Sequence, residues 1–225
     1  MDQNEFIKTY FNLLTEHLIK HGYDGNELIK AVMTGTFAMI NNDSGKSNED
    51  IFWETFSSLV DTDEKLVKTF EKFYEEVFDQ VEKVTSKDED VVKIIKILKE
   101  KGYTLALATN PLFPQIATFK RIRWAGLNPN DFKLVTTYEN SYHCKPNLKY
   151  YQDILETLNK KPDECLMIGN DIGEDMIINK LGVKSFLLTN FLINNVNENV
   201  DNYQNGDYKK LLELVNEFEN LNEGA

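Results

Sequence analysis

The chain has 225 residues, of which 41% are hydrophobic, and this is enough for one large domain or for a core with a smaller companion. Its 25 Lys and Arg residues stand against 37 Asp and Glu residues, which gives a formal net charge of -12. This charge would repel a phosphate backbone or an anionic bilayer, and it argues against nucleic acid or a membrane surface as the main partner. It leaves room for a small phosphorylated molecule, because a lysine or a Mg²⁺ ion can reverse the sign of the charge inside one cleft.

The cysteine content and the hydropathy pattern indicate a cytoplasmic protein. Cys144 and Cys165 are the only two cysteines, and no secretory segment precedes them, so we expect two reduced thiols. No apolar run approaches the roughly 20 residues that are needed to span a bilayer. We therefore expect a chain that works in the cytoplasm without a membrane anchor.

The first 85 residues are predicted to be helical. Apolar residues recur three and four positions apart, which is typical of amphipathic helices. The predicted helices cover residues 5–20, 26–40, 49–60 and 63–83. Ser47, with Asp50 three residues later, resembles a helix-starting cap. His17 and His21 are four positions apart, but no acidic third ligand accompanies them, and we interpret them as ordinary surface or capping histidines.

From residue 87 onward, helical and strand-like segments alternate. The predicted helices cover residues 90–101, 111–125, 148–158, 174–181 and 208–218. The predicted strands cover residues 103–109, 132–138, 165–169 and 183–189, and a polar loop covers residues 190–205. Such alternation is typical of a doubly wound parallel sheet. We predict an α/β fold with a helical domain over residues 1–86 and an α/β core over residues 87–225.

One predicted strand ends in a cluster of carboxylates. The apolar run from Leu166 to Ile168 stops at Gly169, and Asp171, Glu174 and Asp175 follow. Ligands of open α/β sheets bind at the carboxyl ends of the strands, and carboxylate oxygens are the ligands that Mg²⁺ prefers. The alternative is that these acidic residues only favour the first turn of the next helix, where the helix dipole stabilises them.

Two other predicted strands are followed by residues suited to an anion. Thr109 and Asn110 offer a hydroxyl group and backbone N–H groups at a predicted helix start, which suits an oxyanion. Lys145 is a point charge that can neutralise a phosphate or a carboxylate. Thr109 could instead be only a helix cap, and Lys145 only an exposed lysine before a helix. The carboxyl ends of parallel strands meet at one edge of the sheet, so we expect these residues and the carboxylates to lie close together.

These three sites resemble motifs of the haloacid dehalogenase-like hydrolase superfamily. Its second motif is a strand that ends in Thr or Ser, its third is a Lys that often precedes Pro, and its fourth is a Gly-Asp strand end with another Asp a few residues later. The segments 107–111, Lys145-Pro146 and 168–175 resemble them in that order. The resemblance implies a Rossmann-like core with an α-helical cap, and a Mg²⁺-dependent phosphatase acting on a small phosphorylated metabolite.

The resemblance also implies a role for each residue. Thr109 and the backbone of Asn110 would bind the transferred phosphoryl group, and Lys145 would hold the charges of nucleophile and phosphate together. Asp171 or Asp175 would hold Mg²⁺. Asn170 occupies a position that is often Asp in this superfamily, so the choice among these three as metal ligands stays open, as do the substrate and the oligomeric state.

The first motif of the superfamily, an Asp-x-Asp at the end of a central strand, has no counterpart ahead of the first predicted helix. Met1 to Glu5 contains neither an apolar strand nor a pair of aspartates two residues apart. Without that strand the sheet would carry unpaired edges or a gap, which is costly in buried hydrogen bonds. We hypothesise that the sequence begins at an internal Met, and that residues 1–225 alone are close to inactive because they lack the nucleophile.

Two other functions stay open. One is a non-catalytic relative that binds a phosphorylated ligand or a protein partner through the same cleft. The other is a dehalogenase that acts on a carbon–halogen bond. Dehalogenation needs no Mg²⁺, so the retained carboxylates at Asp171 and Asp175 favour phosphate chemistry.

Overall fold

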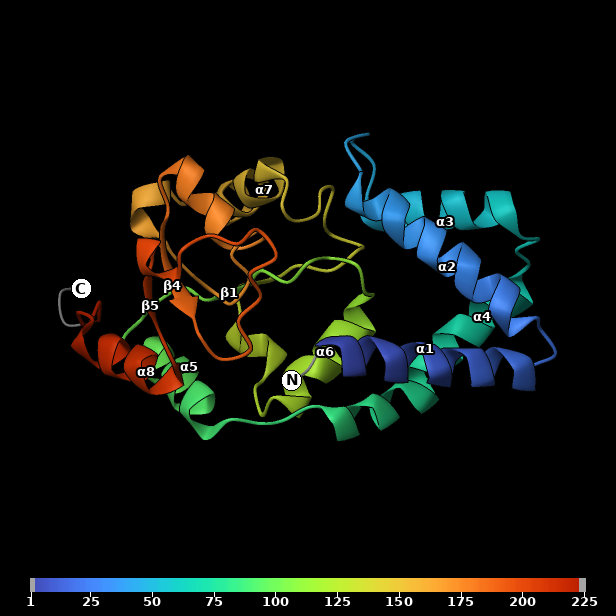
Figure 1. Cartoon of the computed structure of the whole chain (residues 1–225), viewed down its shortest axis with the longest axis horizontal. Coiled ribbons are helices and arrows are strands. Elements are labelled where there is room, and N and C mark those ends of the chain that lie inside the picture. The colour runs from blue at the N-terminus through green and yellow to red at the C-terminus, as the bar shows by residue number, and fades with distance from the viewer. Residues whose placement is uncertain (1–2, 223–225) are drawn as a thin grey trace. The chain divides into compact units, whose positions relative to one another are not determined.

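The structure is a computed structural model that describes residues 3–222 (Figure 1). By their contacts these residues form two compact units. The helical unit contains residues 3–87, 109–126 and 136–144, and the α/β unit contains residues 88–108, 127–135 and 145–222. The change of pattern at residue 87 is the first boundary between the units, and two later segments also belong to the helical unit by their contacts.

The helical unit confirms the helices predicted in the first 85 residues. They are α1 (Gln3–Lys20), α2 (Gly25–Ile40), α3 (Asn48–Leu59) and α4 (Glu64–Lys72), and α6 (Gln115–Trp124) joins them. Side-chain caps begin three of these helices, because an Asp or Ser oxygen accepts an otherwise unpaired N–H of the first turn. Asp24 caps α2, Ser47 caps α3 as predicted, and Asp63 caps α4.

The fourth helix differs from the prediction of a regular helix to residue 83. After α4 the backbone widens into a π-helix, η1 (Phe73–Val77), and then tightens into a 3-10 helix, η2 (Phe78–Val84). The Phe78 N–H donates to the carbonyl of Phe73, which is the five-residue spacing of a π-turn. That spacing brings Phe73 and Phe78 to one side, and both side chains are fully buried. Core packing therefore overrides regular helix geometry at this point.

Aromatic side chains fill the core of the helical unit. The ring centroid of Tyr10 lies 5.8 Å from that of Phe73 and 5.2 Å from that of Phe113, both in edge-to-face geometry. The hydroxyl groups of Tyr10 and Tyr74 are 2.9 Å apart, and burial raises the pKa of Tyr10 to about 12. The polar ends of these buried rings are therefore paired and uncharged.

The α/β unit confirms the α/β class, with a correction to the sheet. Its strands are β1 (Ala106–Leu107), β2 (Leu134–Val135), β3 (Leu166–Gly169), β4 (Lys184–Leu188) and β5 (Gln204–Gly206). All pairings are parallel, but they form a two-stranded sheet, β1-β2, and a three-stranded sheet, β3-β4-β5, where one doubly wound sheet was predicted. β5 was not predicted, because its residues Gln-Asn-Gly carry no apolar signal, and it begins at the end of the predicted polar loop.

Helices cover both faces of these strands. They are α5 (Glu89–Glu100), α7 (Leu148–Leu158), α8 (Tyr208–Glu217) and the 3-10 helix η5 (Met176–Leu181), which was predicted as an α-helix over 174–181. Leu166 and Ile168 of β3 pack against a cluster from α5 and α8, and Met167 packs against a cluster from α7 and η5. Alternate residues of a strand thus point to opposite helical layers, as expected for a strand inside an α/β fold.

The helix predicted from residue 111 begins later, at Gln115. Proline explains the difference, because the residue before a proline is disfavoured in the α-helical region. Phe113 precedes Pro114, and the Phe113 carbonyl accepts the N–H of Tyr138 from another segment of the helical unit. Within residues 3–222, no helix combines the length and the apolar character that a membrane crossing requires.

Candidate active site

A buried ion pair forms the centre of the candidate site in the α/β unit. The Lys145 Nζ donates to Asp175 Oδ1 at 2.5 Å, and the two residues are only 6% and 5% exposed. A buried ion pair is tolerated only where further hydrogen bonds satisfy its remaining atoms. Here the second oxygen, Asp175 Oδ2, accepts the N–H of Asp171 at 3.0 Å. The structure thus brings together three of the residues that the sequence placed in one site.

The loop after β3 is closed by its own hydrogen bonds. Asp171 Oδ1 accepts the N–H of Glu174 at 2.9 Å, and the Asp171 carbonyl accepts the N–H of Asp175 at 2.7 Å. Gly169 permits this close packing, because a Cβ at that position would lie 2.2 Å from Asp175 Oδ2. The sequence marked Gly169 as the end of the strand, but its contact with Asp175 is visible only in the fold.

Two tyrosines at the start of α7 complete the surroundings of Lys145. The Lys145 Nζ lies 5.9 Å from the ring centroid of Tyr150 and 6.0 Å from that of Tyr151, within the range of a cation–π interaction. Tyr151 Oη donates to the Glu174 carbonyl at 2.5 Å and so holds the loop after β3. Burial, and then the charge of Asp175, raise the pKa of Tyr151, so the hydroxyl group stays protonated.

Sequence analysis did not single out these tyrosines. The available signal was their position, since they lie in the first turn of a helix five and six residues after Lys145. That position alone does not distinguish a core tyrosine from one that contacts a charged side chain.

Asn170 is turned toward the loop that follows β4. Its Nδ2 donates to the Phe191 carbonyl at 2.6 Å, and its backbone carbonyl accepts the N–H of Ile193 at 2.8 Å. The amide oxygen of Asn170 is the atom that a cation would use, and its role as a metal ligand stays a prediction.

The carboxylates of this site are of the kind that Mg²⁺ prefers, and their role as metal ligands stays a prediction. Within residues 3–222, no group of three or more His, Cys, Asp or Glu side chains is arranged to hold a metal ion. Both oxygens of Asp175 already accept hydrogen bonds, and Asp171 uses Oδ1 for the Glu174 N–H. Mg²⁺ is commonly held by one or two carboxylates, with water and substrate oxygens as its other ligands. Asp171 Oδ2 fits such a site.

Thr109 and Asn110 belong by their contacts to the helical unit. The Thr109 hydroxyl donates to the Thr136 carbonyl at 3.0 Å, and the Thr136 hydroxyl donates back to the Thr109 carbonyl at 2.9 Å. Thr109 is therefore not the cap of a helix. The expectation that Asn110 lies at a helix start is wrong, because α6 begins five residues later, at Gln115. Phosphoryl binding by these two residues stays a prediction.

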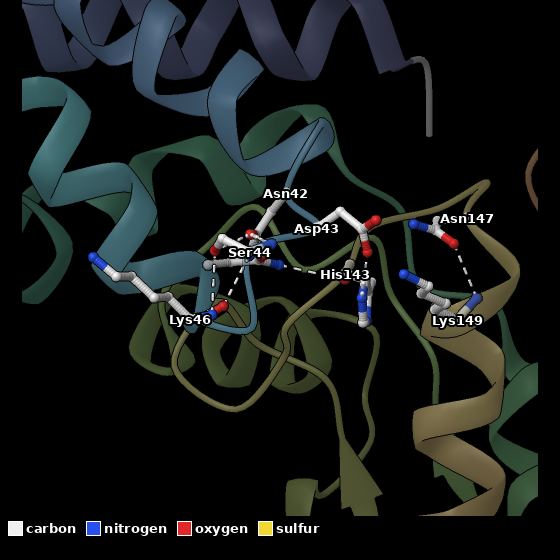
Figure 2. A network of polar contacts seen from close by, with 8 residues as sticks. Asn42, Asp43, Ser44, Lys46, His143, Asn147 and Lys149 are labelled. Atoms are coloured by element: carbon white, nitrogen blue, oxygen red, sulfur yellow. Dashed lines mark hydrogen bonds and ion pairs between the residues drawn. The ribbon is translucent and has the colours of Figure 1, made fainter.

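A polar network fixes the segment that leads to Lys145 (Figure 2). Within the helical unit, Asp43 Oδ1 lies 3.3 Å from His143 Nε2. Asn42 Nδ2 donates to Asn48 Oδ1 at 2.9 Å. Asn48 is fully buried, and its Nδ2 lies 3.4 Å from the His143 carbonyl and 3.3 Å from the Cys144 sulfur. Cys144 is thus a buried packing residue in this network.

Figure 2 also shows the cap of α7 in the α/β unit. Asn147 Oδ1 accepts the N–H of Lys149 at 3.0 Å, so α7 begins with an ordinary side-chain cap. This cap fixes the start of the helix that presents Tyr150 and Tyr151 to Lys145.

The α/β fold, with parallel strands and a charged site in the loop after β3, agrees with the family that the sequence matches. A sequence model of the haloacid dehalogenase-like hydrolase family matches residues 2–180. The chain therefore belongs to the haloacid dehalogenase-like hydrolase family.

Similar proteins agree with this assignment. The chain is 23% identical over 171 residues to the pyrophosphatase PpaX of Bacillus mycoides (strain KBAB4). The matched region covers 76% of this chain and 70% of that protein. It spans about half of other such relatives, for example 52% of the PpaX of Bacillus cereus (strain ATCC 10987 / NRS 248).

Two solved structures share the fold. A haloacid dehalogenase-type (HAD) phosphatase from Thermococcus onnurineus gives a TM-score of 0.57 at 18% identity, covering 96% of this chain and 93% of that one. The HAD-hydrolase YfnB from Bacillus subtilis, a structure bound to magnesium, gives a TM-score of 0.52 at 16% identity, covering 93% and 92%.

Proposed function

We propose that this protein hydrolyses a phosphate monoester of a small metabolite with the help of Mg²⁺. The observation that carries the proposal is the buried Lys145–Asp175 pair beside Asp171 at the carboxyl end of β3. Membership of the haloacid dehalogenase-like hydrolase family supports it, as does the similarity to a pyrophosphatase. The magnesium bound in the YfnB structure supports the choice of cation.

In this proposal Lys145 binds the anionic part of the reaction. Its ammonium group would stabilise the negative charge of the transferred phosphoryl group, and Asp175 would keep it oriented. Asp171, with Asn170, would hold Mg²⁺, which would supply further positive charge to the phosphoryl oxygens. Tyr151 fixes the loop that carries Asp171 through its bond to the Glu174 carbonyl.

Among residues 3–222, no Asp-x-Asp sequence lies at the end of a strand, where the family resemblance places the nucleophile. The family resemblance implies an aspartate that attacks phosphorus and forms an aspartyl-phosphate, which water then hydrolyses. The described chain has two Asp-x-Asp sequences, and both begin helices. Asp63 of the first accepts the Leu66 N–H at 2.7 Å, and Asp88 of the second accepts the Asp90 N–H at 2.9 Å. We propose that the nucleophile lies outside residues 3–222.

A phosphatase assay tests this proposal. An aryl phosphate with Mg²⁺ would be given to residues 1–225 and to the product of the complete reading frame that contains them. We expect turnover in the longer product only, and a loss of roughly 100-fold or more in kcat for its Lys145→Met variant, as for the removal of one charge-stabilising group. Turnover by residues 1–225 alone would show that the nucleophile assignment is wrong.

A second candidate is a non-catalytic protein that binds a phosphorylated ligand at the same site. Two observations favour it. Lys145 keeps its hydrogen bond to Asp175 in the loop after β3. Both Asp-x-Asp sequences, in contrast, lie at helix starts, where Asp63 caps α4 and Asp88 caps α5. Absence of turnover in both products, together with phosphate binding that Lys145→Met abolishes, would favour this function.

A further inference from the structure

A short segment that follows β4 lies beside the loop that carries Asp171. We call this segment, residues 190–194, the strap. The N–H of Ile193 donates to the Asn170 carbonyl at 2.8 Å, and the Ile193 carbonyl accepts the N–H of Ile172 at 3.0 Å. These two hydrogen bonds form an isolated parallel bridge between Ile193 and Asp171. The strap is thus fixed to the residues on either side of Asp171.

The side chain of Asn170 adds a third bond to the strap. Its Nδ2 donates to the Phe191 carbonyl at 2.6 Å. A carbonyl oxygen is an acceptor, so only a side chain that carries a hydrogen can make this bond. An ionised aspartate at position 170 would place an oxygen against the carbonyl, and the two acceptors would repel each other. The bond therefore gives a physical reason for Asn at a position that is often Asp in this superfamily.

Phe191 holds this carbonyl in place at a conformational cost. Its φ angle is 54°, in the left-handed region that bulky residues rarely adopt. Burial of the residue does not offset this cost, since Phe191 is 55% exposed. Leu192 beside it packs against a buried cluster that includes Ile172. Such strain persists only where neighbouring contacts fix the backbone, and the bond from Asn170 and the packing of Leu192 are contacts of this kind.

Asp171 is held from two sides as a result. Its N–H donates to Asp175 Oδ2 at 3.0 Å, and its carbonyl accepts the Asp175 N–H at 2.7 Å. The strap fixes the residues before and after Asp171 on the other side. The backbone of Asp171 therefore depends on the buried Asp175 and on the strap together.

We propose that the strap holds the loop after β3 in its observed conformation, and that the amide of Asn170 is the group that fastens the strap. The amide does this in two ways, because its backbone carbonyl accepts the Ile193 N–H and its side chain binds the strained Phe191. The proposal concerns how the loop is held, and it is independent of the proposed reaction.

Amide hydrogen exchange tests the strap, in the product of the complete reading frame and in buffer without divalent cations. In Asn170→Asp we expect the amides of Ile172 and Ile193 to exchange at least about tenfold faster, because a repulsion replaces a hydrogen bond. Asn170→Ala removes the bond without the repulsion, and we expect an increase of about threefold. The Thr189 amide donates to the Gly206 carbonyl of β5 and is the internal reference, which should not change.

Asn194→Asp is the matched control. Asn194 also belongs to the strap, but its Nδ2 donates to the Glu198 carbonyl at 2.9 Å, away from the loop after β3. This variant gains the same charge and loses an amide of the same kind. It should leave the exchange of Ile172 and Ile193 unchanged.

Phe191 provides a second test that leaves Asn170 unaltered. Phe191→Gly removes the strain of a positive φ angle, whereas Phe191→Ala keeps it. We expect the Ile193 amide to exchange about threefold more slowly in the Gly variant than in the Ala variant. Equal exchange in these two variants would contradict a strained Phe191.

Two results at position 170 would overturn the proposal. One is unchanged exchange of Ile172 and Ile193 in Asn170→Asp. The other is an equal acceleration at Thr189, because the substitution would then act on the whole α/β unit. Neither result depends on turnover, so a failure of the strap leaves the proposed phosphatase intact, and an absence of turnover leaves the strap intact.

Discussion

The two units bury polar side chains of different kinds. Among the described residues, the buried polar side chains of the helical unit are all uncharged when their histidine is neutral: His17, Asn42, Asn48, Thr69, Thr118, Thr136, Thr137 and Ser141. In the α/β unit the buried polar residues are Lys145 and Asp175, and both carry charge.

Neutral buried side chains and buried charged side chains have different energetic requirements. A neutral buried group needs only a hydrogen-bond partner, as Asn48 has in Asn42. A buried ion pair is often no more stable than an apolar pair of the same volume, so it is weak evidence for a stabilising role. Among the described residues, Lys145 and Asp175 are the buried charged ones, and they lie beside Asp171 in the loop after β3, a region where ligands of α/β folds bind. The proposed site at Lys145 and Asp175 therefore also differs from the rest of the described core in being charged.

The largest expected effect comes from breaking the buried pair. Asp175→Asn would leave the Lys145 ammonium buried without a counter-charge, and we expect a loss of about 3–5 kcal/mol in the free energy of unfolding. Urea unfolding measures this loss. The control is Lys68→Met, because the ion pair of Lys68 with Glu64 is exposed and should contribute little. An equal loss in the free energy of unfolding for both variants would contradict a larger cost of breaking the buried pair.

A smaller effect is expected from filling the space beside Asp175. Gly169→Ala would place a Cβ 2.2 Å from Asp175 Oδ2, and we expect a destabilisation of about 1–3 kcal/mol from the forced displacement. The matched control is Gly173→Ala in the same loop, whose Cβ would lie 3.4 Å from its nearest neighbour, Val196. Thermal unfolding of both variants measures the difference, and a Gly169→Ala variant as stable as the control would contradict the close packing.

A neutral pair should cost less to break. Thr109→Val removes the hydroxyl that donates to the Thr136 carbonyl, and we expect a loss of about 1 kcal/mol in the free energy of unfolding. Thr157→Val is the control, because the Thr157 hydroxyl bonds to the Asp153 carbonyl on an exposed helix surface. In the longer product, a fall in kcat of Thr109→Val beyond its effect on stability would indicate that the hydroxyl also binds the phosphoryl group.

The smallest effect is a dependence of stability on pH through His17. His17 is buried, so its interpretation as a surface or capping histidine is wrong. Burial lowers the pKa of His17 below its ordinary value of 6.5, and its Nε2 lies 3.0 Å from the Thr69 carbonyl. The unfolded chain therefore takes up a proton more readily below pH 6.5, so folding stability should fall as the pH falls through that value. His17→Gln should flatten this dependence between pH 8 and pH 5.5, measured by urea midpoints. An unchanged slope would contradict a neutral buried His17.

The local structure was largely predictable from the sequence. The helix cap at Ser47 and the apolar periodicity of α1, α2 and α3 involve residues only a few positions apart. The same holds for β3, β4 and α7, whose observed bounds lie within about one residue of the predicted ones. These features depend on short-range preferences that a sequence displays directly.

Parts of the site were predictable for a related reason. Lys145, Asp171 and Asp175 each follow a predicted strand, and the fold brings them together. The shift of the helix start from 111 to Gln115 was also readable in principle, because Pro114 disfavours a helical Phe113. The roles of Tyr151 and Gly169 were not readable, since each depends on a group brought close by folding.

Residue types at short spacing were enough to predict the α/β class, most helices and the chemical character of the strand ends. Tertiary structure alone decided that Asp175 pairs with Lys145 thirty residues away, that the backbone takes a π-turn between Phe73 and Phe78, and that the strands form two sheets. Each of these outcomes depends on which distant segments share a layer, and burial and pairing across the whole fold set that choice.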